Sequence, residues 1–249
     1  MTFDSTLKKE RGPSVFALFE FKLAENAYYR YTDADEAVRF NGNVFTPEQV
    51  TYSDVVSDGT LKKTTLDVET RYGLKPAKVF RVDPPSFVTT LTIWEANFTD
   101  RDREFRMVWS GRVLNCKIER EKAKFSCEPL STTLARPGLR RNYQRPCPHA
   151  LYGPLCKAAR AEQAVSWVGG TANQWTVTKP NIGFIGPETY EGGLVSWVDS
   201  DNLTRYQTIL TSQEDGANLV LGVNRALSPS QTPKNIKLVK GCNHTETAC

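Results

Sequence analysis

The sequence contains very little histidine and no long run of apolar residues. Only His149 and His244 occur in 249 residues, so Ser-His-Asp or Cys-His catalysis and histidine-rich metal sites have little material to use. No stretch approaches the roughly 18 apolar residues of a membrane helix, and the N-terminus lacks the apolar core of a signal peptide. These absences predict a protein that is not an enzyme and that is made in a cytoplasm-like compartment.

The chain also lacks a strong charge imbalance. Its 32 Lys and Arg and 28 Asp and Glu give a net charge of +4, which is too little to indicate a nucleic-acid binder without a local cluster. One local cluster exists, because every charged residue between Arg136 and Arg160 is basic. This segment is either a solvated loop or a counter-charge for an anionic group.

Short alternations of apolar and polar residues run along most of the chain. The length suits one large or two ordinary domains, and 39% hydrophobic residues argue against disorder. The alternation predicts strands at Val15–Leu23, Tyr28–Tyr31, Val50–Val56, Leu61–Glu69, Phe87–Trp94, Phe105–Ile118, Lys122–Glu128, Ala164–Val168, Gln174–Thr178, Gly193–Val198, Arg205–Leu210, Asn218–Val223 and Ile236–Val239. Asn41-Gly42 predicts a tight turn, and Cys156–Gln163 is the one helix-like stretch. We therefore predict a mainly β fold of two β-barrel-like domains, residues 1–140 and a smaller 141–249, joined by an irregular cysteine-containing segment.

The six cysteines fall into two classes by their surroundings. Cys116 and Cys127 lie in a predicted hairpin and are expected to be buried core thiols, since free cysteine is often fully buried. The other four lie in two turn-rich segments that bracket the second predicted domain, with Cys147 and Cys156 before it and Cys242 and Cys249 after it. These four are the candidate ligands of a metal centre.

Four thiolates from two irregular loops can form a closed Cys₄ site, because they converge from several directions and turn amides can donate to the sulfurs. Their spacings, C-x₈-C and C-x₆-C, differ from the C-x₂-C pairs of many zinc sites. The basic stretch around Cys147 and Cys156 favours an anionic [4Fe–4S] cluster. Zinc at the four cysteines, or a Cys₂His₂ zinc site that uses His149 and His244, remains an alternative, as does a redox or electron-transfer protein.

At these residues the sequence resembles the baseplate hub, or tail-tip, proteins of long-tailed bacteriophages and gene transfer agents, a group that includes the lambda tail tip protein. The similar segments are Cys147-Pro-His-Ala-Leu-Tyr-Gly-Pro-Leu-Cys156, the later Lys240-Gly-Cys242 with Cys249, Tyr29-Arg-Tyr-Thr-Asp-Ala-Asp and Phe40-Asn-Gly-Asn-Val-Phe-Thr-Pro. The resemblance covers nearly the whole chain. It implies that Cys147, Cys156, Cys242 and Cys249 bind an iron–sulfur cluster, whereas Cys116 and Cys127 do not match the pattern.

The resemblance further implies a homotrimeric structural hub at the distal end of the virion tail, assembled in the host cytoplasm. Its expected partners are the distal tail ring protein, the central tail fibre or spike and other tail-tip proteins, with no membrane contact in the resting virion and with DNA contact in the channel left open. A cell-wall hydrolase is the further alternative. The Asp33–Asp35–Glu36 group is the one carboxylate cluster that invites it, and this group fits a solvated turn better.

Overall fold

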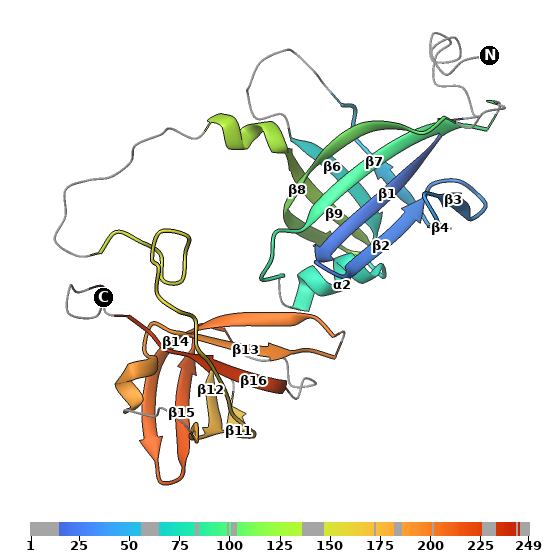
Figure 1. Cartoon of the computed structure of the whole chain (residues 1–249). Coiled ribbons are helices and arrows are strands. Elements are labelled where there is room, and N and C mark those ends of the chain that lie inside the picture. The colour runs from blue at the N-terminus through green and yellow to red at the C-terminus, as the bar shows by residue number, and fades with distance from the viewer. Residues whose placement is uncertain are drawn as a thin grey trace. The chain divides into compact units, whose positions relative to one another are not determined.

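The computed structural model describes residues 15–55, 65–82, 85–98, 100, 104–135, 147–171, 173–181, 186–200, 202–225, 233–242 and 244. The chain divides into two compact units, Met1–Pro137 and Gly138–Cys249. Strands dominate both units (Figure 1), which confirms the predicted mainly β fold. No helix within the described ranges is long and apolar enough to cross a membrane.

The first unit contains one nine-stranded sheet in the order β3-β4-β2-β1-β7-β8-β9-β6-β5. Neighbouring strands in this sheet are antiparallel except for the parallel pair β2 and β4. The strands are β1 (Val15–Ala24), β2 (Ala27–Thr32), β3 (Val38–Phe40), β4 (Asn43–Pro47), β5 (Val50–Tyr52), β6 (Leu66–Arg71), β7 (Thr90–Asn97), β8 (Arg106–Glu119) and β9 (Lys122–Pro129), with helices α2 (Lys75–Val82) and η1 (Leu130–Ala135).

Curvature of this sheet makes the unit barrel-like. The last strand, β5, lies close to β1 and β7. The Tyr52 ring of β5 packs 5.7 Å from the ring of Phe19 in β1, and the Tyr52 hydroxyl donates to Glu95 in β7. Inside, Phe21 packs against Phe125 at 5.3 Å between ring centres, and Phe80 of α2 packs on the same Phe125 at 5.8 Å. Helix α2 therefore covers one end of the sheet, as Figure 1 shows.

The second unit contains a seven-stranded antiparallel sheet in the order β10-β16-β13-β14-β15-β12-β11. Its elements are β10 (Glu162–Ala164), β11 (Trp167–Thr171), β12 (Gln174–Thr178), η2 (Pro187–Tyr190), β13 (Leu194–Val198), β14 (Thr204–Asp215), β15 (Asn218–Val223) and β16 (Lys234–Val239). The two edge strands of the sheet, β10 and β11, are consecutive in the chain. The sheet must therefore curl so that its two edges come together at the short connection between these strands. Trp175 and Trp197 pack edge to face in its core, with ring centres 4.9 Å apart.

The sequence predicts the Asn41-Gly42 turn correctly and the short helices wrongly. Asn41 and Gly42 have φ of 48° and 74° and join β3 to β4, as a two-residue hairpin turn requires. The helix expected at Cys156–Gln163 is wrong, because Lys157 takes φ of 27° and β10 begins at Glu162. Helix α2 was not predicted, since its eight residues are too few to show a clear helical period.

Candidate cysteine centre

The C-terminal cysteine loop, which carries Cys242, packs with its backbone against the turn between η2 and β13. Beyond β16, the Gly241 N–H donates to the Thr189 carbonyl at 2.8 Å. A Cβ on Gly241 would lie 1.7 Å from the Glu191 carbonyl oxygen, and a Cβ on Gly193 would lie 2.2 Å from that of Val239. Only glycine permits so close an approach of two backbones. The position of the neighbouring Cys242 is therefore set by this contact.

The first cysteine loop is built from two successive turns and contains no strand or helix from Cys147 to Cys156. The Gly153 N–H donates to the Ala150 carbonyl at 2.9 Å, and the Cys156 N–H donates to the Gly153 carbonyl at 3.0 Å. Tyr152 takes a left-handed φ of 57° between them. The predicted irregular backbone is thus confirmed, and both cysteines are half-buried.

The two loops meet, although they are far apart in sequence. The Cys147 N–H donates to the His244 carbonyl at 2.8 Å, and the Tyr152 hydroxyl donates to the Lys240 carbonyl at 2.7 Å. Burial first, and then the nearby thiols of Cys156 and Cys242, raise the pKa of Tyr152. The phenol is therefore protonated at neutral pH and remains a donor.

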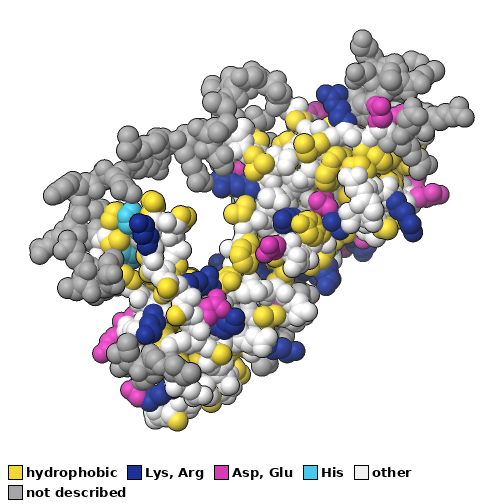
Figure 2. Space-filling view, in the orientation of Figure 1, with side chains coloured by type: hydrophobic (Ala, Val, Ile, Leu, Met, Phe, Trp, Pro, Cys, Tyr) yellow, Lys and Arg dark blue, Asp and Glu magenta, His cyan; other side chains and the backbone are white. Residues whose placement is uncertain are grey.

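The chain's two histidines belong to these same loops and lie near the junction. In Figure 2 the histidine side chains, in cyan, lie beside both hydrophobic and Lys or Arg side chains of the second unit. The structure therefore brings together the loops that carry Cys147, Cys156 and Cys242, while the fourth candidate ligand, Cys249, lies outside the described residues.

None of the cysteines that the structure describes is in a disulfide. All five described cysteines are free thiols, and the His244 N–H donates to Cys242 Sγ at 3.3 Å. Amide hydrogen bonds to sulfur are characteristic of thiolates that hold iron–sulfur clusters, where they adjust the cluster's potential.

The described residues of the two loops do not form a preformed metal site. Among the described residues, His149 and His244 included, no three His, Cys, Asp or Glu side chains lie close enough to share one metal ion. This holds for Cys147, Cys156 and Cys242 as much as for a Cys₂His₂ set with the two histidines, so the described geometry does not distinguish an iron–sulfur cluster from zinc. In a cluster each thiolate binds a different iron, so its ligands lie farther apart than those of one zinc.

Part of the positive charge between Arg136 and Arg160 is already paired within the protein and does not face an open site. Arg160 lies 3.2 Å from Glu162 and stacks 4.9 Å from the centre of the Tyr206 ring, so its charge is already engaged. Lys157 directly follows Cys156 and is exposed. The remaining members of the basic stretch, Arg136, Arg140, Arg141 and Arg145, lie outside the described residues.

Cys116 and Cys127 belong to the first unit. Cys127 is fully buried, as predicted, and burial raises its pKa to about 12. Cys116 is only half-buried, because β8 continues past the end of β7 and pairs there with β9 alone. Burial still raises the pKa of Cys116 to about 11, so both thiols are protonated and are poor metal ligands.

The three acidic residues Asp33, Asp35 and Glu36 lie in a turn that follows β2. Asp33 accepts a hydrogen bond from the Ala17 N–H at 2.6 Å, and Asp35 and Glu36 are exposed. This confirms the expectation of a solvated turn.

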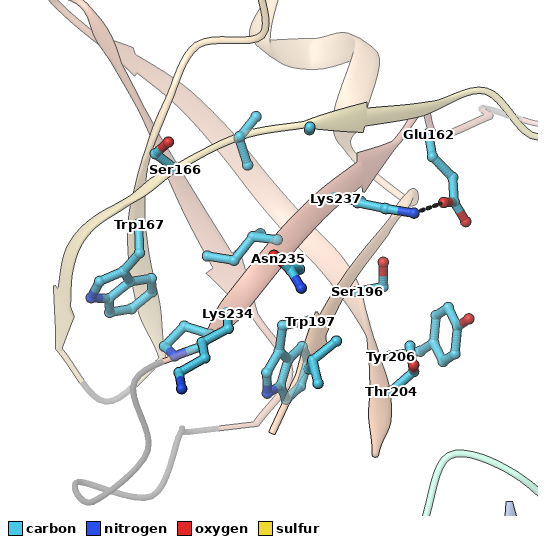
Figure 3. A pocket seen from close by; sticks show the side chains of 15 residues that line it. Glu162, Ser166, Trp167, Ser196, Trp197, Thr204, Tyr206, Lys234, Asn235 and Lys237 are labelled. Carbon is cyan, nitrogen blue, oxygen red and sulfur yellow. Dashed lines mark hydrogen bonds and ion pairs between the residues drawn. The ribbon is translucent and has the colours of Figure 1, made fainter. Parts of the chain in front are cut away.

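A cavity of about 820 Å³ in the second unit was not anticipated from the sequence. Figure 3 shows Trp167, Trp197 and Lys234 around its lower part, and Lys237 paired with Glu162 at 2.7 Å across its upper part. The described lining offers hydroxyl groups but no histidine or cysteine, and its one carboxylate is held by a lysine. A nucleophile with an activating base is therefore not assembled there.

Comparison with known proteins gives a consistent result. The family model of the baseplate hub protein, N-terminal attachment domain, matches residues 4–159, a range that includes the whole Cys147–Cys156 loop. No curated protein matches the sequence. Among solved structures, a chain from the virion of a native gene transfer agent particle is similar, with a TM-score of 0.73, 17% identity, and coverage of 100% of this chain and 86% of that chain. At this identity the similarity establishes the fold.

Proposed function

Since this chain belongs to the family of baseplate hub proteins with an N-terminal attachment domain, we propose that it connects the tail tube to the central fibre and that a [4Fe–4S] cluster stabilises its second unit. Family membership gives the coarser role: a structural protein of the baseplate, located in the virion tail. The cluster, the trimer and the particular neighbours are the steps that the proposal adds.

The junction of the two cysteine loops is the observation that supports the cluster. Cys147, Cys156 and Cys242 would each bind one iron, and Cys249 is the fourth ligand expected from the sequence. A bound cluster supplies a cross-link with four protein ligands. Because the ligands bracket β10 to β16, this cross-link would join the start of the second unit to its end and would restrict the unfolded chain, as closing a long loop does.

The two-unit architecture supports the hub geometry. Each unit is a curled, mainly antiparallel sheet, so three chains could place six barrel-like units around one axis. Such a trimer presents a quasi-six-fold face to the distal tail ring and a three-fold face to the central fibre or spike. Closed cyclic symmetry of this kind is usual for permanent homo-oligomers.

The cluster is tested by anaerobic purification of the full chain, followed by iron and sulfide analysis. We expect four irons and four sulfides per chain and broad absorbance near about 400 nm. Cys116→Ala is the matched control, and it should leave the iron content unchanged. One zinc per chain without iron, or a disulfide between Cys147 and Cys156, would contradict the cluster.

The hub geometry is tested by a reconstruction of the tail tip. We expect three copies at one level around the channel. Six copies at one level, or copies outside the tube wall, would show that the protein is a peripheral tail component instead.

A further inference from the structure

The junction between the cysteine loops is held by contacts that use no cysteine sulfur. Two of them join the loops directly, from Cys147 to His244 at 2.8 Å and from Tyr152 to Lys240 at 2.7 Å, and a third, from Gly241 to Thr189 at 2.8 Å, fixes the C-terminal loop to η2. The donors are two backbone amides and one phenol, and every acceptor is a backbone carbonyl. A metal-free chain can therefore form all of them.

Tyr152 differs from the other two donors because it reaches across with its side chain. Its hydroxyl connects residues 88 apart in sequence, and its backbone is in the left-handed region that non-glycine residues rarely adopt. The turn closed by Gly153 and Ala150 holds that conformation. The loop is thus shaped so that this one side chain points to the base of the C-terminal loop.

We propose that Tyr152 is the positioning residue of the cysteine centre. Its hydroxyl, bound to the Lys240 carbonyl, fastens the Cys147–Cys156 loop to the Cys242 loop before any metal arrives. The role as a positioning residue for a cofactor rests on the proposed cluster, whereas the fastening itself does not. The cofactor would then bind two loops that already lie together, unlike the metal of small zinc domains that remain unfolded without it.

Tyr152→Phe isolates the hydroxyl, because phenylalanine keeps the ring and removes only the donor. The matched control is Tyr28→Phe in the first unit. The Tyr28 ring lies against Lys22 and Arg30, and its hydroxyl has no hydrogen-bond partner among the residues that the structure describes.

The first measurement is amide hydrogen exchange, read by NMR on the metal-free full chain. We expect Tyr152→Phe to speed exchange of the Cys147 amide about fivefold to tenfold, the size of one net hydrogen bond, and to change the Gly241 amide less. Tyr28→Phe should change neither amide. If the Cys147 amide of the metal-free wild type exchanges as fast as in Tyr152→Phe, the loops are not fastened by Tyr152 and the proposal is overturned.

The second measurement is release of iron to a chelator after anaerobic reconstitution with iron and sulfide. Tyr152→Phe should lose iron about fivefold to tenfold faster than the wild type and the Tyr28→Phe control, and equal rates in all three chains would overturn the positioning role. A wild-type chain that takes up no iron but keeps the Tyr152-dependent amide protection would refute the proposed cluster and leave the fastening of the loops intact.

Discussion

Gly241→Ala tests the backbone contact that seats the C-terminal cysteine loop. The new Cβ would lie 1.7 Å from the Glu191 carbonyl oxygen and 2.8 Å from the Gly193 nitrogen, which is far inside van der Waals contact. The two backbones must therefore separate by more than about 1 Å, and the hydrogen bond from Gly241 to Thr189 is then lost. That loss costs about 1 kcal/mol, and the forced separation adds about 1–3 kcal/mol, as overpacking does.

Gly169→Ala is the control for the general effect of replacing a glycine in this unit. Gly169 lies in β11, and a Cβ there meets no atom within 4 Å. We expect a change below about 0.5 kcal/mol for Gly169→Ala and a loss of about 3 kcal/mol for Gly241→Ala. For a unit of this size that loss lowers the melting temperature by about 10 °C or more.

Tryptophan fluorescence during denaturation provides the assay, because Trp167, Trp175 and Trp197 lie in the second unit, while Trp94 and Trp109 report on the first unit, which neither variant alters. The measurement is made on the metal-free full chain, so that any effect on metal binding does not enter. Equal denaturation midpoints for Gly241→Ala and Gly169→Ala would show that the close approach of the two backbones is not a real constraint.

Three further predictions follow from particular contacts. Cys242→Ser should abolish iron binding and lower the melting temperature of the second unit while leaving the first unchanged, as calorimetry of the anaerobic protein can show; an unchanged profile would contradict the structural cross-link. Asp199→Asn should destabilise the second unit by about 3 kcal/mol, because it removes the carboxylate charge 2.8 Å from the buried Arg205 guanidinium, whereas Glu162→Gln at an exposed pair should cost less than about 1 kcal/mol in the same denaturant titration. Cys116 and Cys127, whose pKa values burial raises to about 11 and 12, should remain protonated and resist alkylation at pH 8, while Cys147 and Cys242 of the metal-free chain react; rapid labelling of Cys127 would contradict its burial.

Features encoded by neighbouring residues could be predicted from the sequence. Asn41-Gly42 produces its hairpin because both residues tolerate positive φ. The loop from Cys147 to Cys156 is irregular because Pro148 and Pro154 interrupt any regular backbone pattern. The buried Cys127 follows from alternation along β9. In each case a short stretch of chain contains the whole physical cause.

Features that join distant segments could not be predicted in this way. Gly193 and Gly241 appear in the sequence as turn residues, and their close contact depends on the pairing of β13 with β16. The hydrogen bond from Tyr152 to Lys240 requires both loops to be placed by the fold. Arg160 belongs to a basic stretch in the sequence, yet Glu162 engages its charge in the structure.

The most direct test of the cysteine centre is an anomalous diffraction map recorded at the iron edge from anaerobically grown crystals. Our account predicts one strong peak at the junction of the two loops, bonded to the sulfurs of Cys147, Cys156, Cys242 and Cys249. A map with no iron peak there, or one in which Cys249 lies away from the other three thiols, would contradict it.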